Sequence, residues 1–287
     1  MILVADSGST KTNWIAINDK GETYFKIDTK GLNPAVFSRE TLFDRVITKK
    51  ELYDIKDEVD KIFFYGAGCG TQHAVNFLRD VFQDIFVNAD IEIQEDTIAA
   101  VKSLQTDEPG VVCILGTGSN CSFYDGKQTH QKIVSLGYIL MDAASGNFYG
   151  KQILKDYQYR KMPKEIAEQF EKQYDLRPDI IKQNLYKNDN PNTYLADVGR
   201  FLIENKQSDY AQKIIKDGLR FFVENQILQF EEARNVPIYF VGSIAHFLAD
   251  EIKEVLQEYD LKLGKIIRHP IITLAQHHAS QMVDGLD

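Results

Sequence analysis

The sequence predicts a mixed α/β protein made of two halves, each organised around a central sheet. Short apolar runs typical of buried strands alternate with polar stretches whose apolar residues recur at helical spacing. Each half opens with a strand, a turn rich in glycine and hydroxyl groups, and a second strand. Pro109-Gly110 is the best candidate hinge, so the expected domains are 1–108 and 109–287.

In the first half, three strands precede an alternation of strands and helices. The expected strands are 1–5, 14–17, 22–29, 61–65 and 89–94, and the expected helices are 38–53, 75–85 and 98–104. The early strands should be antiparallel, because short turns join them, whereas helices separate the later, parallel strands. The Gly31-Leu32-Asn33-Pro34 segment divides the two patterns, because proline and the residue before it resist regular structure.

The second half is expected to be richer in helix. Two strands at 111–115 and 121–124 precede a mainly helical region from Phe148 to about Arg234, whose apolar stripes are assigned to the core. A strand at 238–241, a Gly242-Ser243 turn and a helix at 245–259 follow. A last strand at 265–268 precedes the Pro270 break and a closing helix from about Ala275, which is a candidate to pack back on the first lobe.

Composition limits the function classes. Hydrophobic residues make up 44% and charged residues 26% of the chain, a balance typical of soluble globular proteins. The net charge of −9 argues against a nucleic-acid partner. No apolar run approaches membrane-spanning length and the start of the chain enters a strand directly, so we expect a cytoplasmic protein without a membrane partner. The three cysteines and six histidines show no metal-ligand spacing.

The turn at residues 6–12 has the groups that a phosphate tail needs. Gly8 permits a tight turn, backbone amides supply N–H donors, and Asp6 at the strand end can hold Mg²⁺ through water. The hydroxyls come from Ser7, Ser9, Thr10 and Thr12, and the cation comes from Lys11. An ordinary polar hairpin is the alternative for this turn taken by itself.

A similar hairpin opens the second half. The strand at 111–115 runs into Gly116-Thr117-Gly118-Ser119-Asn120 and a second strand, in the same order as the first hairpin. Two such hairpins indicate duplicated domains that face each other across a cleft, although Gly/Ser turns are common enough for a chance match.

In order and spacing, these motifs resemble the actin/hexokinase/heat-shock-chaperone nucleotide-binding superfamily. More closely, the chain is similar to the BadF/BadG-type branch that contains N-acetylglucosamine kinases. The segments that carry the resemblance are DSGSTKTNW at 6–14, GLNP at 31–34, FYGAGC at 64–69, ED at 95–96, LGTGSNC at 115–121, SLGYIL at 135–140 and FVGSIA at 240–245. The resemblance implies two ribonuclease-H-like, actin-like ATPase lobes with mixed five-stranded sheets flanking a cleft, the second lobe being helix-rich.

The resemblance also implies roles for individual residues. Asp96 would be the general base that deprotonates a sugar hydroxyl, although a helix N-cap is the alternative on residue type. ATP would lie between the lobes, with Mg²⁺ near Asp6. Its phosphates would meet Asp6, Gly8, Ser9, Thr10, Lys11 and Thr12 from one lobe and Gly116, Thr117 and Gly118 from the other, with Gly242 and Ser243 near the adenosine. The amino sugar would meet Asn33, Gly68, Ser119, Asn120 and Asp142. Asn33 and Asn120 have an alternative as turn residues, and Cys69 is assigned to packing.

One segment departs from the resembled family. Relatives carry Gly-Asp-Glu-Gly-Ser-Gly where this chain has Met141-Asp142-Ala143-Ala144-Ser145-Gly146. A carboxylate and two glycines are lost, which removes backbone freedom beside the expected cleft.

We therefore expect an ATP-dependent kinase for the primary hydroxyl of N-acetylglucosamine or a close relative such as N-acetylmuramic acid. The alternatives are a BadF-type ATPase activator, for which the cysteines are poorly arranged, and a non-catalytic sugar or nucleotide sensor. A homodimer is compatible with the sequence. Rossmann and P-loop sites are disfavoured, because neither glycine motif occurs.

Overall fold

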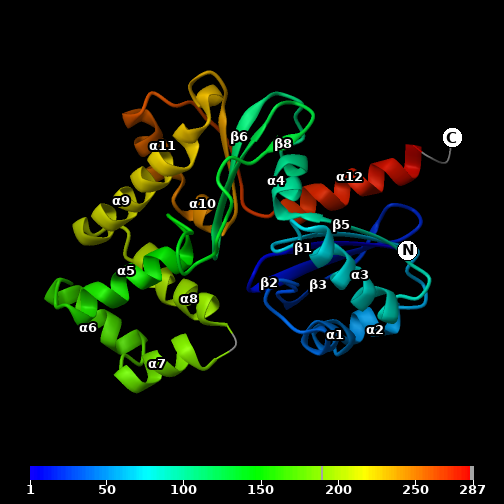
Figure 1. Cartoon of the computed structure of the whole chain (residues 1–287), viewed down its shortest axis with the longest axis horizontal. Helices are drawn as coiled ribbons and strands as arrows, with labels where there is room; N and C mark the ends of the chain where they lie inside the picture. Colours follow the sequence, from blue (N-terminus) through cyan, green and yellow to red (C-terminus); the bar gives the residue numbers. More distant parts are fainter. Residues whose placement is uncertain (189, 285–287) are drawn as a thin grey trace. The chain divides into compact units, whose positions relative to one another are not determined.

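The computed structural model describes residues 1–188 and 190–284 and divides the chain into two compact units (Figure 1). The first unit contains Met1–Thr106 and the segment that begins at His269, and the second is Asp107–Arg268. Each unit has a five-stranded sheet with both parallel and antiparallel pairs, so the predicted α/β class with two mixed sheets is confirmed. None of the described helices combines the length and apolar character that a bilayer crossing requires.

The sheet of the first unit has the strand order β3-β2-β1-β4-β5. Its strands are β1 (Ile2–Ser7), β2 (Lys11–Ile17), β3 (Thr23–Lys30), β4 (Lys61–Gly66) and β5 (Asp90–Glu95). The β1–β2 and β2–β3 pairs are antiparallel and the β1–β4 and β4–β5 pairs are parallel, as predicted. The helices are α1 (Arg39–Ile47), α2 (Lys50–Asp54), α3 (Gln72–Ile85), α4 (Asp96–Leu104) and α12 (Pro270–Asp284).

Helices cover both faces of this sheet, which explains why its central strands have nearly continuous apolar sequences. Along β1, Leu3 and Ala5 join the core that includes residues of α1, α2 and α3, whereas Ile2 and Val4 join a second core with α4 and α12. Helix α12 begins at Pro270 and not near Ala275 as predicted. Proline fits the first helical position, because the N–H that it lacks has no partner there.

The second unit contains the sheet β10-β9-β6-β7-β8. Its strands are β6 (Gly110–Leu115), β7 (Ser119–Tyr124), β8 (Thr129–His130), β9 (Ile238–Val241) and β10 (Leu263–Ile267). The helices are α5 (Gly146–Gln158), α6 (Lys164–Gln173), α7 (Pro178–Tyr186), α8 (Pro191–Glu204), α9 (Asp209–Asn225), α10 (Ser243–Phe247) and α11 (Ala249–Glu258), with short 3₁₀ turns at Ile227–Gln229 and Glu231–Arg234. This unit is helix-rich, as predicted.

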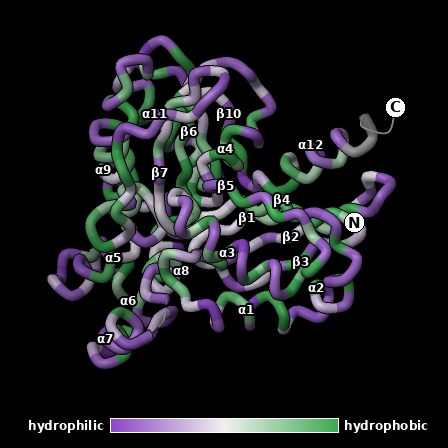
Figure 2. The backbone as a smooth tube through the Cα atoms, turned by 45° about the vertical axis from the view of Figure 1, so that its right-hand side comes forward, coloured by the Kyte–Doolittle hydropathy of each residue, from purple (hydrophilic) through white to green (hydrophobic). Residues whose placement is uncertain are grey.

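The helix predicted at 245–259 is wrong as a single element, because the chain leaves helical geometry at Leu248 and forms α10 and α11 instead. Hydrophobic and hydrophilic positions alternate along the helices of this unit in Figure 2. This amphipathic pattern is the one expected of helices that bury one side against a core.

Candidate functional site

The turn between β1 and β2 is supported from inside by two buried hydroxyls. Leu32 N donates to Ser7 Oγ at 3.0 Å, and Ser7 Oγ lies 2.7 Å from Thr12 Oγ1. Thr12 Oγ1 also lies 3.3 Å from the carbonyl oxygen of Lys30, to which it can donate. The hydroxyl of Thr12, which was predicted to meet a phosphate, is therefore used inside the protein to hold the turn.

The outer part of this turn is formed by Gly8, Ser9, Thr10 and Lys11. Gly8 N donates to Lys11 O at 3.0 Å, which closes the turn. A Cβ added at Gly31 would lie 2.5 Å from Ser9 O and 2.7 Å from Gly8 O, so the following loop can support the turn only if this position is glycine. Lys11 Nζ pairs with Asp28 Oδ2 at 2.8 Å, but both side chains are half exposed, so the pair is weak and the cation can exchange partners.

Two carboxylates lie close enough to interact electrostatically beside the turn. Asp6 lies near the end of β1, and Asp96 is the first residue of α4, directly after β5. Burial raises the pKa of the Asp6 carboxyl to about 7, and the nearby carboxylate of Asp96 contributes to the rise. Glu95 occupies the N-cap position of α4, so Asp96 does not have the capping role that was its alternative.

The carboxylate of Asp6 fits a magnesium ion that arrives with a nucleotide. Within residues 1–188 and 190–284, no three His, Cys, Asp or Glu side chains are grouped as a metal site would require. Mg²⁺ at nucleotide sites takes one or two carboxylates and completes its shell with water and phosphate oxygens. A divalent cation would also relieve the repulsion that raises the pKa of Asp6.

The predicted sugar residues of the first unit lie against one another. Gly68 has a φ of +82°, and a Cβ at this position would lie 2.8 Å from Asn33 Cγ. Asn33 Oδ1 accepts a hydrogen bond from Ala35 N at 2.9 Å, so this buried side chain also forms the turn that was its alternative role.

The loop that contains Gly68 also lies beside the start of α4. Burial raises the pKa of the adjacent Cys69 thiol to about 12, with further contributions from the carboxylates of Asp96 and Glu95. Cys69 is therefore a neutral thiol at physiological pH and is not a nucleophile. The first unit thus brings Asn33, Gly68 and Asp96 into one neighbourhood.

In the second unit, the turn between β6 and β7 is fixed by the N-terminus of α5. Gly116 N donates to Gly118 O at 2.9 Å, which closes the turn. Gly146 N donates to Gly116 O at 2.9 Å, and Asn147 N donates to Thr117 O at 3.0 Å. Since these acceptors are carbonyls of the turn, α5 holds the turn through its own first amides. A Cβ at Gly116 would meet no atom within 4 Å, so this face of the turn is open.

Asp142 is buried against the same turn. A Cβ at Gly118 would lie 2.6 Å from Asp142 Oδ2, and Asn147 Nδ2 donates to that oxygen at 2.9 Å. Burial raises the pKa of the Asp142 carboxyl, and hydrogen bonds from Asn147 and from the backbone N–H of Ser119 partly offset the rise. The structure therefore places Gly118, Ser119 and Asp142 together.

The altered segment after Asp142 is strained. Asp142 and Ala144 have φ values of +65° and +58°, a conformation that costs most residues other than glycine about 1–2 kcal/mol. Ser145 stabilises the segment, because its Oγ donates to Asp142 O at 2.6 Å and accepts from Phe148 N at 3.3 Å as the N-cap of α5. The glycine that the resembled family carries at position 144 would adopt this backbone without strain.

Gly242 packs on the end of β6. Its φ is +120°, and an added Cβ would lie 2.9 Å from the carbonyl carbon of Leu115 and 3.5 Å from Gly116 N. The predicted adenosine residues Gly242 and Ser243 are therefore adjacent to the second turn. Asn120 is part of β7, and its Oδ1 accepts from Cys121 N and from Gln131 Nε2, both at 2.8 Å.

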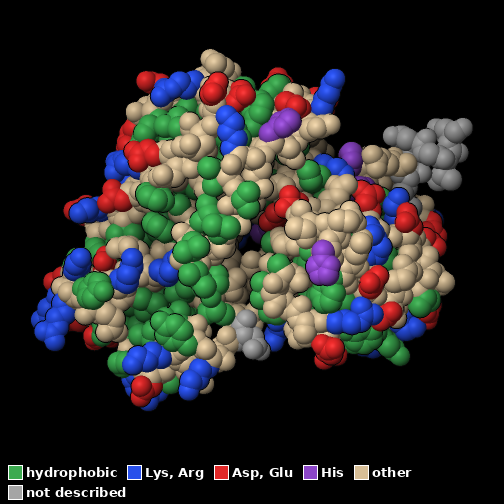
Figure 3. Space-filling model, in the orientation of Figure 1, with side chains coloured by type: hydrophobic (Ala, Val, Ile, Leu, Met, Phe, Trp, Pro, Cys, Tyr) green, Lys and Arg blue, Asp and Glu red, His purple; other side chains and the backbone are tan. Residues whose placement is uncertain are grey.

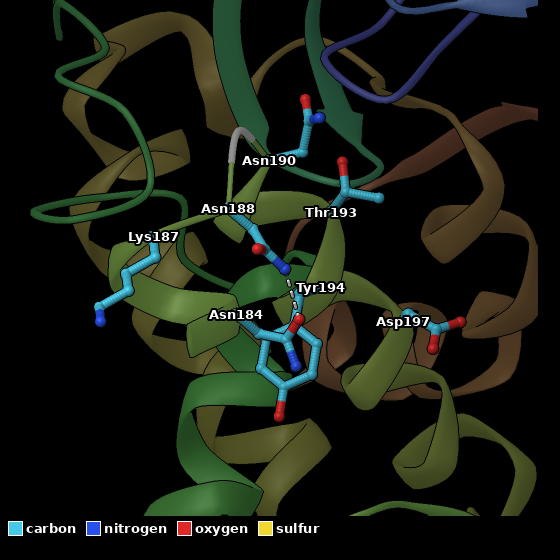
Figure 4. Close-up of a pocket in the computed structure, with 7 residues that line it drawn as sticks. All are labelled: Asn184, Lys187, Asn188, Asn190, Thr193, Tyr194 and Asp197. Atoms are coloured by element: carbon cyan, nitrogen blue, oxygen red, sulfur yellow. Dashed lines mark hydrogen bonds between the residues drawn. The ribbon is translucent and has the colours of Figure 1, made fainter. Parts of the chain in front are cut away.

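None of the predicted site residues lines the hollow formed by α7, α8 and the described residues between them. The volume of this hollow is about 540 Å³. Figure 4 shows that its labelled side chains point in several directions. The hollow is lined by Asn184, Lys187, Asn188, Asn190, Thr193, Tyr194 and Asp197. Hydrophobic side chains gather on the face of this unit drawn in Figure 3. The segment before Asp142 also has exposed apolar side chains, namely Val134, Leu136, Ile139 and Leu140.

Sequence reasoning missed three residues that shape the two turns. The sequence analysis treated Gly31 only as part of the segment that ends the third strand. A glycine can also indicate that two backbone segments approach closely, as Gly31 and the turn at Gly8 and Ser9 do. Ser145 and Asn147 were not assigned, although a serine before a helical stripe is a usual N-cap signal.

No protein-family model matches the sequence, and no curated protein matches it significantly. Among solved structures, a protein of Porphyromonas gingivalis proposed to be an N-acetylglucosamine kinase is 28% identical, with a TM-score of 0.88 over 98% of this chain and 99% of that one. A protein of Chromobacterium violaceum with the same proposed activity is 14% identical, with a TM-score of 0.74 over 97% and 98%.

A third similar structure is a ROK family glucokinase of Streptomyces griseus in complex with glucose and AMPPNP. It is 12% identical, with a TM-score of 0.60 over 97% of this chain and 99% of that one. Because their sequence identities are only 14% and 12%, the Chromobacterium and Streptomyces proteins show similarity of fold alone. The chain has the two-lobe, actin-like fold of these proteins.

Proposed function

We propose that this protein is an ATP-dependent sugar kinase that phosphorylates the primary hydroxyl of an N-acetylated amino sugar, with N-acetylglucosamine as the first candidate. The observation that carries the proposal is the pair of carboxylates, Asp6 and Asp96, beside a tight hydroxyl-rich turn. The likeness to the Porphyromonas protein extends over nearly the whole of both chains and supports the same substrate class.

In the proposed reaction, Asp96 accepts the proton of the sugar hydroxyl. At the same time, the oxygen of that hydroxyl forms a bond to the γ-phosphorus of ATP. The bond between that phosphorus and the β–γ bridging oxygen breaks, and ADP leaves. Asp6 would hold Mg²⁺, which would supply positive charge to the phosphate oxygens when bound. Asp6 favours its ionised form once a cation is present, because the cation offsets the burial and repulsion that raise its pKa.

The remaining predicted residues have proposed binding roles. Ser9, Thr10 and the backbone amides from Gly8 to Lys11 bind phosphate from the first unit, and the open face of Gly116–Gly118 binds it from the second. Gly242 and Ser243 contact the adenosine. Sugar hydroxyls are bound by Asn33 and Gly68 of the first unit and by Ser119, Asn120 and Asp142 of the second. The contacts of Gly68 with Asn33 and of Asp142 with Ser119 support these roles.

The test is ADP release by the purified chain with Mg²⁺ and a panel of sugars that includes glucose, N-acetylglucosamine and N-acetylmuramic acid. We expect release that depends on an N-acetylated sugar and is lost by at least about a hundredfold in Asp96→Asn. Asp90→Asn, which changes an exposed aspartate at the other end of β5, is the matched control and should keep full activity. Sugar-independent hydrolysis, or full activity in Asp96→Asn, would contradict the proposal.

A non-catalytic sugar sensor is the second candidate, and the strained Ala144 is the observation that favours it. Sugar-induced thermal stabilisation without phosphate transfer would support the sensor over the kinase. The ATPase activator is less favoured. All three cysteines are buried, and Cys113 and Cys121 lie 3.7 Å apart inside the sheet, away from any surface that a shared iron–sulfur cluster could use.

A further inference from the structure

A row of hydrogen-bonded polar side chains links the first sheet, α4 and α12 within a largely apolar core, and the carboxylate of Glu92 lies near Tyr65 and Lys102. Lys102 Nζ of α4 donates to Tyr65 Oη of β4 at 3.0 Å, and Tyr65 Oη lies 2.9 Å from His278 Nε2 of α12. Their surroundings are mainly hydrophobic, including Val4 and Leu274. The three groups belong to three elements that are far apart in sequence.

The chemistry of Lys102 fixes the direction of the first hydrogen bond. An ammonium group has no lone pair, so Lys102 can only donate, and Tyr65 Oη must accept from it. This leaves the proton of Tyr65 free to donate to His278 Nε2 at 2.9 Å, in which case the neutral imidazole carries its proton on Nδ1. Burial, followed by the charge of Lys102, lowers the pKa of His278 to about 4, in agreement with a neutral, accepting ring.

Packing alone does not require a histidine at this place. The His278 ring stacks on Phe63 with centroids 3.6 Å apart and an interplanar angle of 12°, a contact that phenylalanine could also make. Moreover, His278 Nδ1 is buried without a hydrogen-bond partner among the protein atoms that the structure describes. A buried polar group with an unmet bond lowers stability, so its hydrogen bond to Tyr65 is the contribution that is specific to histidine.

The chain of bonds connects directly to the elements that carry the carboxylate pair. Tyr65 lies opposite Asp6 in the register of the parallel β1–β4 pair, so both side chains project from the same face of the sheet. Lys102 lies on α4, whose first residue is Asp96. Apolar contacts are non-directional and allow a helix to shift or rotate on a sheet, whereas two consecutive hydrogen bonds fix its position.

We propose that Lys102, Tyr65 and His278 are positioning residues that hold α4, and with it Asp96, in place against Asp6. This inference rests on the proposed kinase function for its catalytic consequence. The repulsion between the two carboxylates would otherwise favour a larger separation of α4 from β1. A displacement of a catalytic group by about 1 Å can reduce the rate by up to a hundredfold.

The kinetic test uses Tyr65→Phe, His278→Phe and the double variant, all in the full chain. We expect kcat to fall about tenfold in each single variant, with KM for ATP and sugar within about twofold of the wild type. The double variant should be no slower than the slower single variant, because either substitution removes the hydrogen bond between Tyr65 and His278. Tyr149→Phe is the matched control. It removes one buried tyrosine hydroxyl, bonded to Ile215 O at 3.1 Å, in the core of the second unit.

Equal kcat losses in Tyr149→Phe, or losses that multiply in the double variant, would overturn the positioning role. Ring-nitrogen NMR shifts give a readout independent of activity. His278 should be the Nδ1–H tautomer in the wild type and a mixture in Tyr65→Phe, and an Nε2–H tautomer in the wild type would contradict the inferred bond direction. If the wild-type protein transfers no phosphate, the proposed function is refuted. The tautomer of His278 then still tests whether Tyr65 donates to His278, independently of activity.

Discussion

Replacement of Gly242 by alanine should destabilise the second unit strongly. The φ of +120° and ψ of 171° at Gly242 belong to a region that is open essentially to glycine alone, at a cost of about 1–3 kcal/mol for other residues. The added Cβ would also lie 2.9 Å from the carbonyl carbon of Leu115, and such overpacking costs about 1–3 kcal/mol more. We therefore expect a loss of about 2–6 kcal/mol in the free energy of unfolding.

Two other glycines separate the contributions to this loss. Gly137 has a φ of +78° but no heavy atom within 4 Å of an added Cβ, so Gly137→Ala should cost only the strain, about 1–2 kcal/mol. Gly116 has neither a positive φ nor a neighbour within 4 Å, so Gly116→Ala should change stability by less than about 0.5 kcal/mol. Its Cβ would nevertheless occupy the open face of the second turn, and we expect the Kd for ATP to rise about tenfold.

Urea unfolding followed by far-UV circular dichroism measures these differences, because the second unit is helix-rich. Fluorescence is less suitable, since the single tryptophan, Trp14, lies in the first unit. A wild-type unfolding midpoint in Gly242→Ala would refute the close contact between Gly242 and the end of β6. Unchanged ATP affinity in a stable Gly116→Ala would refute the role of the second turn.

Three further predictions concern strain, burial and the proposed sugar loop. Ala144→Gly should stabilise the chain by up to about 1 kcal/mol, because glycine adopts the φ of +58° without strain, and a destabilised variant in urea unfolding would contradict this. The folded pKa of His278, about 4, lies below its ordinary value of 6.5, so stability should fall by about 3 kcal/mol as the pH drops from 6.5 to 4. Trp14 fluorescence during urea unfolding measures this slope in the first unit, and an undiminished slope in His278→Phe would exclude His278 as its source. Gly68→Ala should raise KM for the sugar more than KM for ATP, because its Cβ would lie 2.8 Å from Asn33 Cγ, and equal changes in both constants would argue against a sugar loop.

Local sequence patterns predicted the elements well where strand, turn and helix signals were strong. The two hairpins and the buried strand before Gly66 are examples, because apolar runs bounded by glycine are specific for buried strands. Boundaries were less accurate. The proline at 270 looked like a break but begins α12, and the apolar pattern at 245–259 concealed the interruption at Leu248.

The candidate site could be predicted only in part, for physical reasons. The nearness of Asp6 to Asp96 depends on the adjacent, parallel pairing of β1, β4 and β5. The alternation of strands and helices predicted parallel strands, but only the order of motifs in the resembled family indicated that Asp6 and Asp96 belong to one site. The contact between Tyr65 and His278 joins residues 213 positions apart, and neither the apolar strand nor the adjacent histidine pair gives any local sign of it. Similarly, nothing in the turn sequence shows that the Thr12 hydroxyl points inward.

The central claim is that Asp96 promotes transfer of the γ-phosphate of ATP to the primary hydroxyl of an amino sugar. Phosphorus NMR of wild-type and Asp96→Asn reactions with ATP, Mg²⁺ and N-acetylglucosamine tests it most directly. The account predicts a sugar phosphomonoester signal that grows as ATP is converted to ADP with the wild type, and at least about a hundredfold more slowly with the variant. Inorganic phosphate as the only new product, or equal rates for both proteins, would contradict it.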